Sequence, residues 1–561
     1  MASAVRCPNR YSDRMPVFRL RLVDLHRRLI EPARVTVEGE RITAIEALGP
    51  DDAVDDGFLM PGFVDAHVHV ESSMLPPVEF ARVAARHGTV ATISDPHEIA
   101  NVLGEEGVAF MLAEGERACI PIAFGVPSCV PATSFECAGA TLDAAAVARM
   151  LADPRHRYLS EMMNWPGVLG GDAEVAAKIA AAKRLGKPID GHAPGLTGED
   201  ARRYAAAGIS TDHECYTLEE ARDKVAAGMM VLIREGSAAR NHDALWRLVG
   251  EHPNAVMFCT DDAHPDDLLV GHLDRTVAAC VAGGLDRFDV LRAACVGPVE
   301  HYGLPTGLLR VGDRADFIVV DDLDSFRVRE TWIAGRCVAR EGKSLEAFSA
   351  CPTPNRFREA SFSDEDFALR VEGERPRQVR AIAVEDGQLV TGEAIASLRP
   401  RDGVLEPDPA SDTLLLSVCN RYEPAPPALA FVRNMGLRRG AIASSVAHDS
   451  HNVVAAGADR GSIAAAVNAV FAAKGGLAVA SEGGVEVLPL PIAGLMSDRP
   501  AEEVAAAYQS LSRQARELGS PLRAPFMTLS FLALLVIPAL KLGDRGLFDA
   551  RAFRFVDAVI D

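Results

Sequence analysis

The chain has 561 residues, of which 48% are hydrophobic and 24% charged, and this composition is ordinary for a globular protein of about three domains. Its formal net charge of −20, with no basic stripe in the sequence, argues against a nucleic-acid partner. Its 11 cysteines are scattered without a Cys-x-x-Cys pair. This usage predicts a reducing compartment, the cytoplasm, rather than a disulfide framework.

Neither end of the chain carries a segment that is typical of secretion or of membranes. Residues 1–16 are polar and charged, so they lack the apolar core of a secretory signal. The apolar run 526–540 is shorter than the ~20 residues that a membrane span needs, and Pro538 interrupts it. We therefore predict a buried strand or helix there, and no membrane partner.

Two short β-type pieces lie on either side of residues 61–305. Residues 33–45 alternate between polar and apolar side chains about a turn at Gly39, and residues 311–321 and 330–338 repeat this pattern. Each piece alone is too small to be stable. We therefore expect residues 17–60 and 306–348 to join in one small β-sandwich.

Between these pieces, short apolar runs alternate with segments of helical spacing, such as 78–87, 174–185 and 218–227. Eight strand–helix units favour a (β/α)8 barrel over residues 61–305, with a doubly wound sheet as the alternative. The eight runs are 64–70, 89–95, 120–128, 157–162, 188–192, 209–214, 229–235 and 255–262.

Nearly every run finishes in a polar or ionisable residue. In a barrel the carboxyl ends of all strands surround one mouth, so these side chains are expected to converge. His67 and His69 also point to the same face of their strand, and imidazole is a common metal ligand. Exposure to solvent at a strand end would explain one such polar residue. So many polar and ionisable residues at strand ends instead favour a metal site. The residues are His67, His69, Asp95, His97, Glu98, Glu161, Asp190, His192, Asp212, His213, Glu214, Glu235, Asp261 and Asp262.

Several segments resemble the amidohydrolase superfamily and, within it, the bacterial adenine deaminase family with a C-terminal extension. Glu71-Ser-Ser73 and Asp95-Pro-His-Glu-Ile99 are specific to that family, whereas His-x-His alone is not. The similarity covers nearly the whole chain. It is carried by residues 61–74, 95–104, 160–163, 190–195, 213–214, 234–240, 259–262 and 525–534.

The resemblance implies a shell of six metal ligands that holds two divalent ions, with Glu161 bridging them where many superfamily members carry a carboxylated lysine. Imidazole and carboxylate ligands suit zinc, iron or manganese. The resemblance favours Mn2+ or Fe2+, and the ligand types also allow Zn2+. The ligands are His67, His69, Glu161, His192, His213 and Asp261.

The resemblance also implies the hydrolysis of adenine to hypoxanthine and ammonia, a reaction of purine salvage. A metal ion lowers the pKa of its bound water towards ~7. Asp261 would act as general base and then acid, with Glu161 and His213 as the other catalytic residues, although Asp261 is also explained as a ligand alone. The alternatives are an amidohydrolase for a related nucleobase or cyclic amide, and a barrel that has lost its metals. Because all six ligand positions carry residues that can bind a metal, the sequence argues against a barrel that has lost its metals.

Five further residues are candidates for the substrate side of the site. Of Asp95, His97 and Glu98, we expect one, foremost His97, to touch metal or substrate. The competing interpretation is a helix capped by Asp95 with Pro96 as its first residue. Glu235 and Ser237 are expected to read the purine edge.

Residues 352–561 are predicted to form a separate α/β-type domain, and the resemblance implies a homodimer or larger oligomer. The loop Ala447-His-Asp-Ser-His-Asn452 carries His448 and His451. These histidines either bind a metal, line the mouth of the active site, or only cap a turn. The expected strands are 413–418, 440–446, 477–480 and 484–489, and the expected helices are 463–474 and 501–516.

Overall fold

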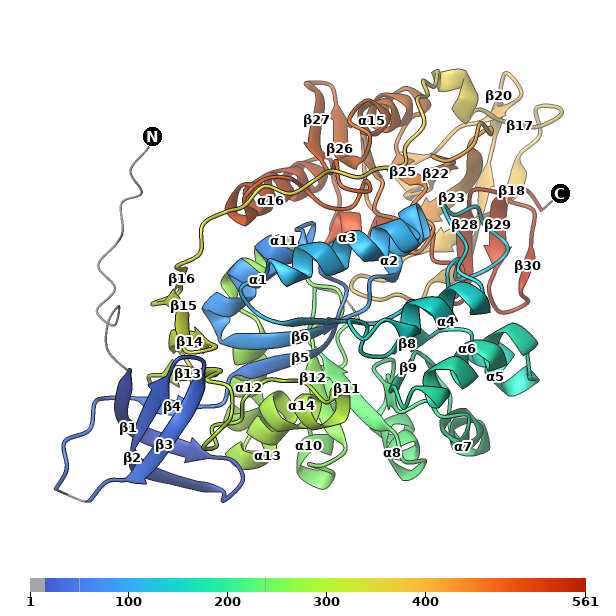
Figure 1. Cartoon of the computed structure of the whole chain (residues 1–561). Coiled ribbons are helices and arrows are strands. Elements are labelled where there is room, and N and C mark those ends of the chain that lie inside the picture. Colours follow the sequence, from blue (N-terminus) through green and yellow to red (C-terminus); the bar gives the residue numbers. More distant parts are fainter. Residues whose placement is uncertain (1–15, 50, 238, 561) are drawn as a thin grey trace.

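The computed structural model describes residues 16–49, 51–237 and 239–560, so residues 1–15, where we predicted no secretory signal, lie outside the described residues. A barrel occupies the middle of the molecule (Figure 1). A small sheet flanks it at one side, and the C-terminal domain lies against it at the other.

The barrel is built from eight parallel strands within the described residues. Backbone hydrogen bonds join them in three groups, β5-β6-β7, β8-β9 and β10-β11-β12. Contacts between strand ends complete the circle, so the barrel is closed and the doubly wound alternative is wrong. The strands are β5 (Phe63–Val68), β6 (Thr89–Ser94), β7 (Ile122–Phe124), β8 (Leu159–Met162), β9 (Ile189–Gly191), β10 (Thr211–Asp212), β11 (Met230–Arg234) and β12 (Val256–Cys259). The closing contacts are the parallel bridges Val126–Leu159 and Val68–Asp261 and the hydrogen bond from Ser210 N to Ile189 O (2.8 Å).

Each barrel strand coincides with one of the predicted apolar runs, although β5 begins one residue before its run. Every residue of β5 and β6 is buried, because side chains fill the barrel on one face and helices cover the other. The helices are α1 (Pro77–Ala84), α2 (His97–Leu103), α3 (Glu105–Glu116), α4 (Ala144–Ala152), α5 (Trp165–Gly170), α6 (Ala173–Arg184), α7 (Gly198–Ala206), α8 (Leu218–Ala226), α9 (His242–Leu245), α10 (Leu248–Glu251), α11 (Pro265–Val270), α12 (Leu273–Ala282), α13 (Arg287–Leu291) and α14 (Gly297–Tyr302).

The two β-type pieces that flank the barrel in the sequence form one sheet. Its order is β16-β15-β14-β13-β4-β1-β2-β3, and β4 joins the pieces by pairing with both β1 and β13. The rings of Phe18, Phe317 and Trp332 pack together in its apolar cluster. The strands are β1 (Val17–Asp24), β2 (Leu29–Glu38), β3 (Arg41–Ala47), β4 (Phe58–Met60), β13 (Phe317–Val320), β14 (Val328–Ile333), β15 (Arg336–Arg340) and β16 (Lys343–Ser344).

The C-terminal domain is a second eight-stranded sheet, ordered β19-β18-β23-β22-β25-β24-β26-β27. Leu415 of β22 faces helix α15, whereas Leu416 faces the cluster of α16 and α17, so both faces are covered. The elements are β18 (Arg377–Ala383), β19 (Gly392–Leu398), β22 (Leu414–Cys419), β23 (Ala428–Arg433), β24 (Ala441–Ser444), β25 (Val453–Gly457), α15 (Arg460–Ala472), β26 (Gly476–Ser481), β27 (Gly484–Pro489), α16 (Ala501–Glu517) and α17 (Pro525–Phe531).

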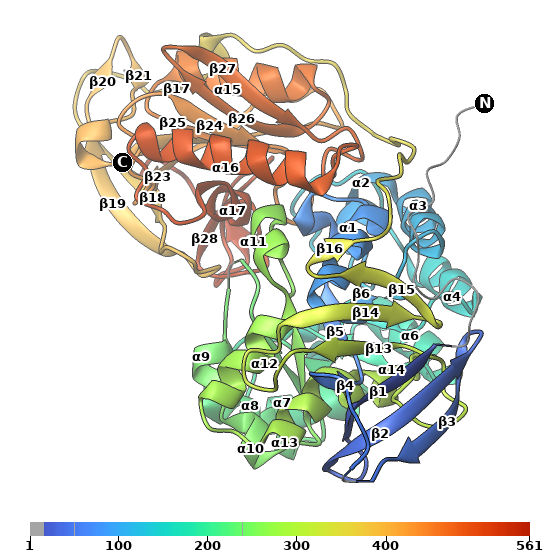
Figure 2. The same ribbon diagram turned by 90° about the vertical axis from the view of Figure 1, so that its left-hand side faces the viewer.

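Figure 2 shows the C-terminal domain above the barrel, with α16 and α17 near α11. The apolar run 526–540 contains most of α17 and ends at strand β28 (Leu540–Gly543), in keeping with the predicted buried element. Within the described part of the chain, no helix combines the length and the apolar character needed to cross a membrane.

Candidate active site

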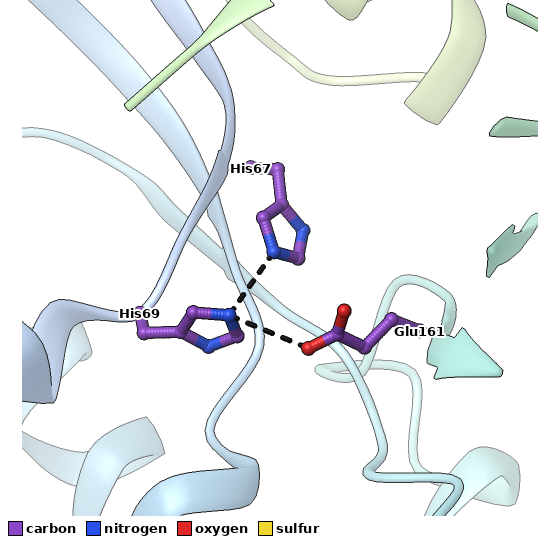
Figure 3. A group of neighbouring side chains, drawn as sticks. All are labelled: His67, His69 and Glu161. Atoms are coloured by element: carbon purple, nitrogen blue, oxygen red, sulfur yellow. Dashed lines mark hydrogen bonds and ion pairs between the residues drawn. The ribbon is translucent and has the colours of Figure 1, made fainter. Parts of the chain in front are cut away.

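The first strand of the barrel aims two imidazoles at one point. His67 lies in β5 and His69 directly follows this strand, and their Nε2 atoms lie 3.2 Å apart. Glu161 from β8 meets this pair, with Oε1 3.3 Å from His69 Nε2 (Figure 3). His69 Nδ1 lies 3.1 Å from the carbonyl oxygen of Asp95, a contact that orients the ring and leaves Nε2 free to bind a metal.

Glu161 stands between four imidazoles, two at each oxygen. Oε1 lies 3.3 Å from His69 Nε2 and 3.2 Å from His97 Nδ1. Oε2 lies 2.8 Å from His192 Nδ1 and 3.2 Å from His213 Nε2. Burial opposes ionisation of this carboxyl, but His192 and His213 outweigh it and hold its pKa well below the usual range.

Asp261, which follows β12, completes the ring of predicted ligands. Its Oδ1 lies 3.5 Å from His67 Nε2 and 3.2 Å from His69 Nε2, and its Oδ2 accepts a hydrogen bond from Arg234 Nη1 at 2.8 Å. Burial opposes ionisation here too, but the positive charge of Arg234 keeps the pKa of Asp261 well below its usual range. The carboxylate is therefore ionised at neutral pH and available to a cation.

All six predicted ligands thus come together at one end of the barrel. Ligand atoms of His67, His69 and Glu161 lie within 4.8 Å of one another, as do those of Glu161, His192 and His213. These are two groups of imidazole and carboxylate donors with Glu161 in common, and all of them are buried except the partly buried His192. The donor set fits divalent metal ions.

The segment after β6 takes part in this site in two ways. His97 contacts Glu161, whereas Glu98 turns to the C-terminal domain and hydrogen-bonds both His448 and His451. Asp95 also accepts a hydrogen bond from the backbone of His97 at 3.1 Å, as the competing interpretation expects. Helix α2 begins at His97, so Pro96 precedes the helix instead of starting it.

The structure does not bring Glu235 and Ser237 to this site. Strand β11 ends with Arg234 pointing into the barrel, so the next side chain points away from it. Glu235 pairs with Arg240 at 3.0 Å, and the Ser237 hydroxyl donates to Asp267 at 2.6 Å. The expectation that Glu235 and Ser237 read the substrate finds no support in this geometry.

Other residues of the site were not predicted. Arg234, which donates to Glu214 and Asp261, was noted only as part of a similar segment. The C-terminal domain supplies one wall of the cavity, and His448 lines it, in keeping with the alternative that the 447–452 loop lines the mouth of the active site. Besides the residues described above, the cavity is lined by Asp262, which was predicted as a polar strand end, and by Met163, Leu389, Asp449, Phe531, Leu534 and Val536.

Comparison with known proteins defines first the class and then the family. The model of the "Amidohydrolase family" matches residues 58–338, which include the barrel and its histidines, so the barrel is that of an amidohydrolase. The model "Adenine deaminase C-terminal domain" matches residues 388–554.

Relatives named adenine deaminase match the chain over nearly its whole length. The protein from Salinibacter ruber is 57% identical over 96% of this chain and 98% of its own. Those from Sulfurovum sp. and Methanosarcina barkeri are 53% and 51% identical, over 96% and 93% of this chain and 98% and 96% of their own. The chain therefore belongs to the adenine deaminase family, and the predictions of this family and of an enzyme are confirmed.

Proposed function

We propose that the chain hydrolyses adenine to hypoxanthine and ammonia at the mouth of its barrel, with two divalent ions in the site. The observation that carries this proposal is the position of Glu161, whose two oxygens each face two imidazoles. A carboxylate in that position is suited to bridge two ions. Membership of the adenine deaminase family supports the choice of substrate.

His67, His69 and Asp261 would hold one ion and His192 and His213 the other, with Glu161 shared between them. A bound divalent ion supplies water that is acidic enough to react at neutral pH. Imidazole and carboxylate donors suit Mn2+ and Fe2+, which the family resemblance favours, and also Zn2+.

Asp261 is the residue we assign to proton transfer. Its pKa is held low, so it is ionised at neutral pH and can take a proton from the attacking water. It then returns that proton to the amino group that leaves C6 as ammonia. Glu161 and His213 lie beside the same point, 3.2 Å from one another, and orient the reacting groups. Arg234 holds Asp261 in place through its 2.8 Å hydrogen bond.

The proposal also includes the domain boundaries, the oligomeric state and the cellular role. The division into residues 17–60 with 306–348, 61–305 and 352–561 stays a prediction, as does a homodimer or larger oligomer. A role in purine salvage in the cytoplasm is consistent with ten free cysteines among the described residues.

The test is to load the purified protein with Mn2+ and to measure ammonia release from adenine, guanine and cytosine, and ring opening of dihydroorotate. We expect ammonia from adenine, and its absence refutes the proposal. Ring opening of dihydroorotate would instead support an amidohydrolase for cyclic amides. Asp261→Asn should abolish turnover, whereas Asp324→Asn, at a side chain that is 86% exposed, should not.

A further inference from the structure

A loop of the C-terminal domain reaches the barrel mouth. Residues 447–452, which connect β24 to β25, carry His448 and His451, and both histidines hydrogen-bond the carboxylate of Glu98 from the barrel. Glu98 is joined in turn to the site through its neighbour His97, which contacts Glu161. The loop is therefore tied directly to the residues around the proposed metal centre.

Contacts on its far side hold the same loop rigidly. The side chain of Asn452 accepts a hydrogen bond from Arg421 N at 3.1 Å and donates one to Cys137 O at 2.9 Å. The Tyr422 hydroxyl donates to Ser450 O at 2.6 Å. Because its geometry is fixed before any ligand arrives, a side chain on this loop can recognise a ligand at little entropic cost.

Asp449 is the acidic side chain that this loop presents to the cavity. It is 3% exposed and lines the cavity beside His448. Its Oδ1 lies 3.7 Å from His97 Nε2, and its buried Oδ2 has no hydrogen-bond partner among the residues that the structure describes. A buried carboxylate oxygen without a partner is costly, which indicates that a ligand supplies the missing donor.

Apolar side chains of the C-terminal domain line the same cavity as Asp449. They are Leu389, Phe531, Leu534 and Val536, and the Phe531 ring stacks on His448 with 5.1 Å between centroids. An apolar wall with one charged acceptor suits a flat heterocycle that carries a ring N–H.

Adenine meets this description if the proposed function holds. With its C6 amino group facing Glu161 and Asp261, N7 of the five-membered ring lies beside that group, whereas N9 lies farther from it, on the edge that can face the residues of the C-terminal domain that line the cavity. That ring carries the N–H of the free base. We propose that Asp449 is a specificity-determining residue that accepts a hydrogen bond from this ring N–H, so that the C-terminal domain recognises the free purine base.

The experiment compares wild type, Asp449→Asn and Asp449→Ala, each loaded with Mn2+, on adenine, 7-methyladenine and 9-methyladenine. For adenine, we expect Asp449→Ala to raise KM by about tenfold to one hundredfold, the range for a hydrogen bond to a charged group, with kcat and metal content nearly unchanged. Asp449→Asn keeps a carbonyl acceptor and should have an intermediate KM. The wild type should have a higher KM for the methylated bases, which lack the ring N–H, than for adenine. This difference in KM should disappear in Asp449→Ala.

A matched control is Asp544→Ala, which removes a buried carboxylate of the same domain that bonds Cys137 N and Asn420, both at 2.9 Å, outside the cavity lining. It should leave the KM for adenine unchanged. An unchanged KM in both Asp449 variants overturns the proposal, as does a loss of bound metal or a fall in kcat alone. A wild type that releases no ammonia from adenine refutes the proposed function itself, and the two failures are thereby distinguished.

Discussion

Arg234 offers the sharpest test of how the active site is held together. Its side chain is 1% exposed and donates to Asp261 at 2.8 Å, to Glu214, and from Nε to the carbonyl oxygen of Ala239. The change Arg234→Met preserves much of the side-chain volume and removes the charge. It leaves two buried carboxylates without their shared cation.

The expected cost follows from these contacts. Removing one partner of a buried ion pair destabilises a protein by about 3–5 kcal/mol, because the remaining charge is buried and uncompensated. We therefore expect the thermal midpoint of Arg234→Met to fall by several degrees. Without Arg234, burial raises the pKa of Asp261 and its orientation is lost. We expect kcat to fall about one hundredfold or more, which corresponds to a rise of about 2.7 kcal/mol in the activation free energy.

The assay is calorimetry together with ammonia release from adenine at equal metal content. Arg234→Lys should give intermediate values, because it keeps the charge and loses the fork of donors. Arg202→Met, at a side chain that is 61% exposed, is the control and should behave as wild type. A wild-type midpoint and kcat in Arg234→Met would refute the reasoning.

Two further predictions concern stability. Burial lowers the pKa of Lys541 from 10.5 to about 7. Between pH 7 and 10.5 the unfolded chain therefore binds more protons than the folded one. The free energy of unfolding of the wild type consequently rises with pH across that range. Lys541→Met should lack this contribution, which is up to about 5 kcal/mol; identical midpoint-against-pH curves for variant and wild type would contradict it. A Cβ at Gly191 would lie 2.4 Å from the backbone carbonyl oxygen of Thr211 in the neighbouring strand. Gly191→Ala should therefore cost about 1–3 kcal/mol of unfolding free energy, measured as a lower thermal midpoint. Gly170→Ala, where nothing lies within 4 Å, is its control, and equal midpoints for the two variants would count against the clash.

The barrel could be predicted from the sequence because its strands are buried on both faces. Such strands appear as continuous apolar runs, and each of the eight predicted runs matches one strand of the closed barrel. The polar ends of the runs converge for the same geometric reason. His67, His69, Glu161, His192 and Asp261 were predicted on strand ends far apart in the chain, and the structure brings them together.

The remaining parts of the site depend on facts that no local pattern carries. Successive side chains of a strand point to opposite faces, so only one of Arg234 and Glu235 points into the barrel. Which of them does so depends on the orientation of β11. The wall that carries Asp449 depends on the docking of a domain whose loop meets Glu98 about 350 residues away in the chain. Contacts at that separation are fixed by tertiary packing and not by periodicity.

The most direct test of the central claim is a metal titration. The protein is stripped of metal, reloaded stepwise with Mn2+, and assayed at each step for bound metal and for ammonia released from adenine. We expect no activity without metal, a rise that saturates at two ions per chain, and loss of both binding and activity in Glu161→Gln. Full activity of the metal-free protein, or a Glu161→Gln variant that binds two ions and retains wild-type activity, would contradict the account.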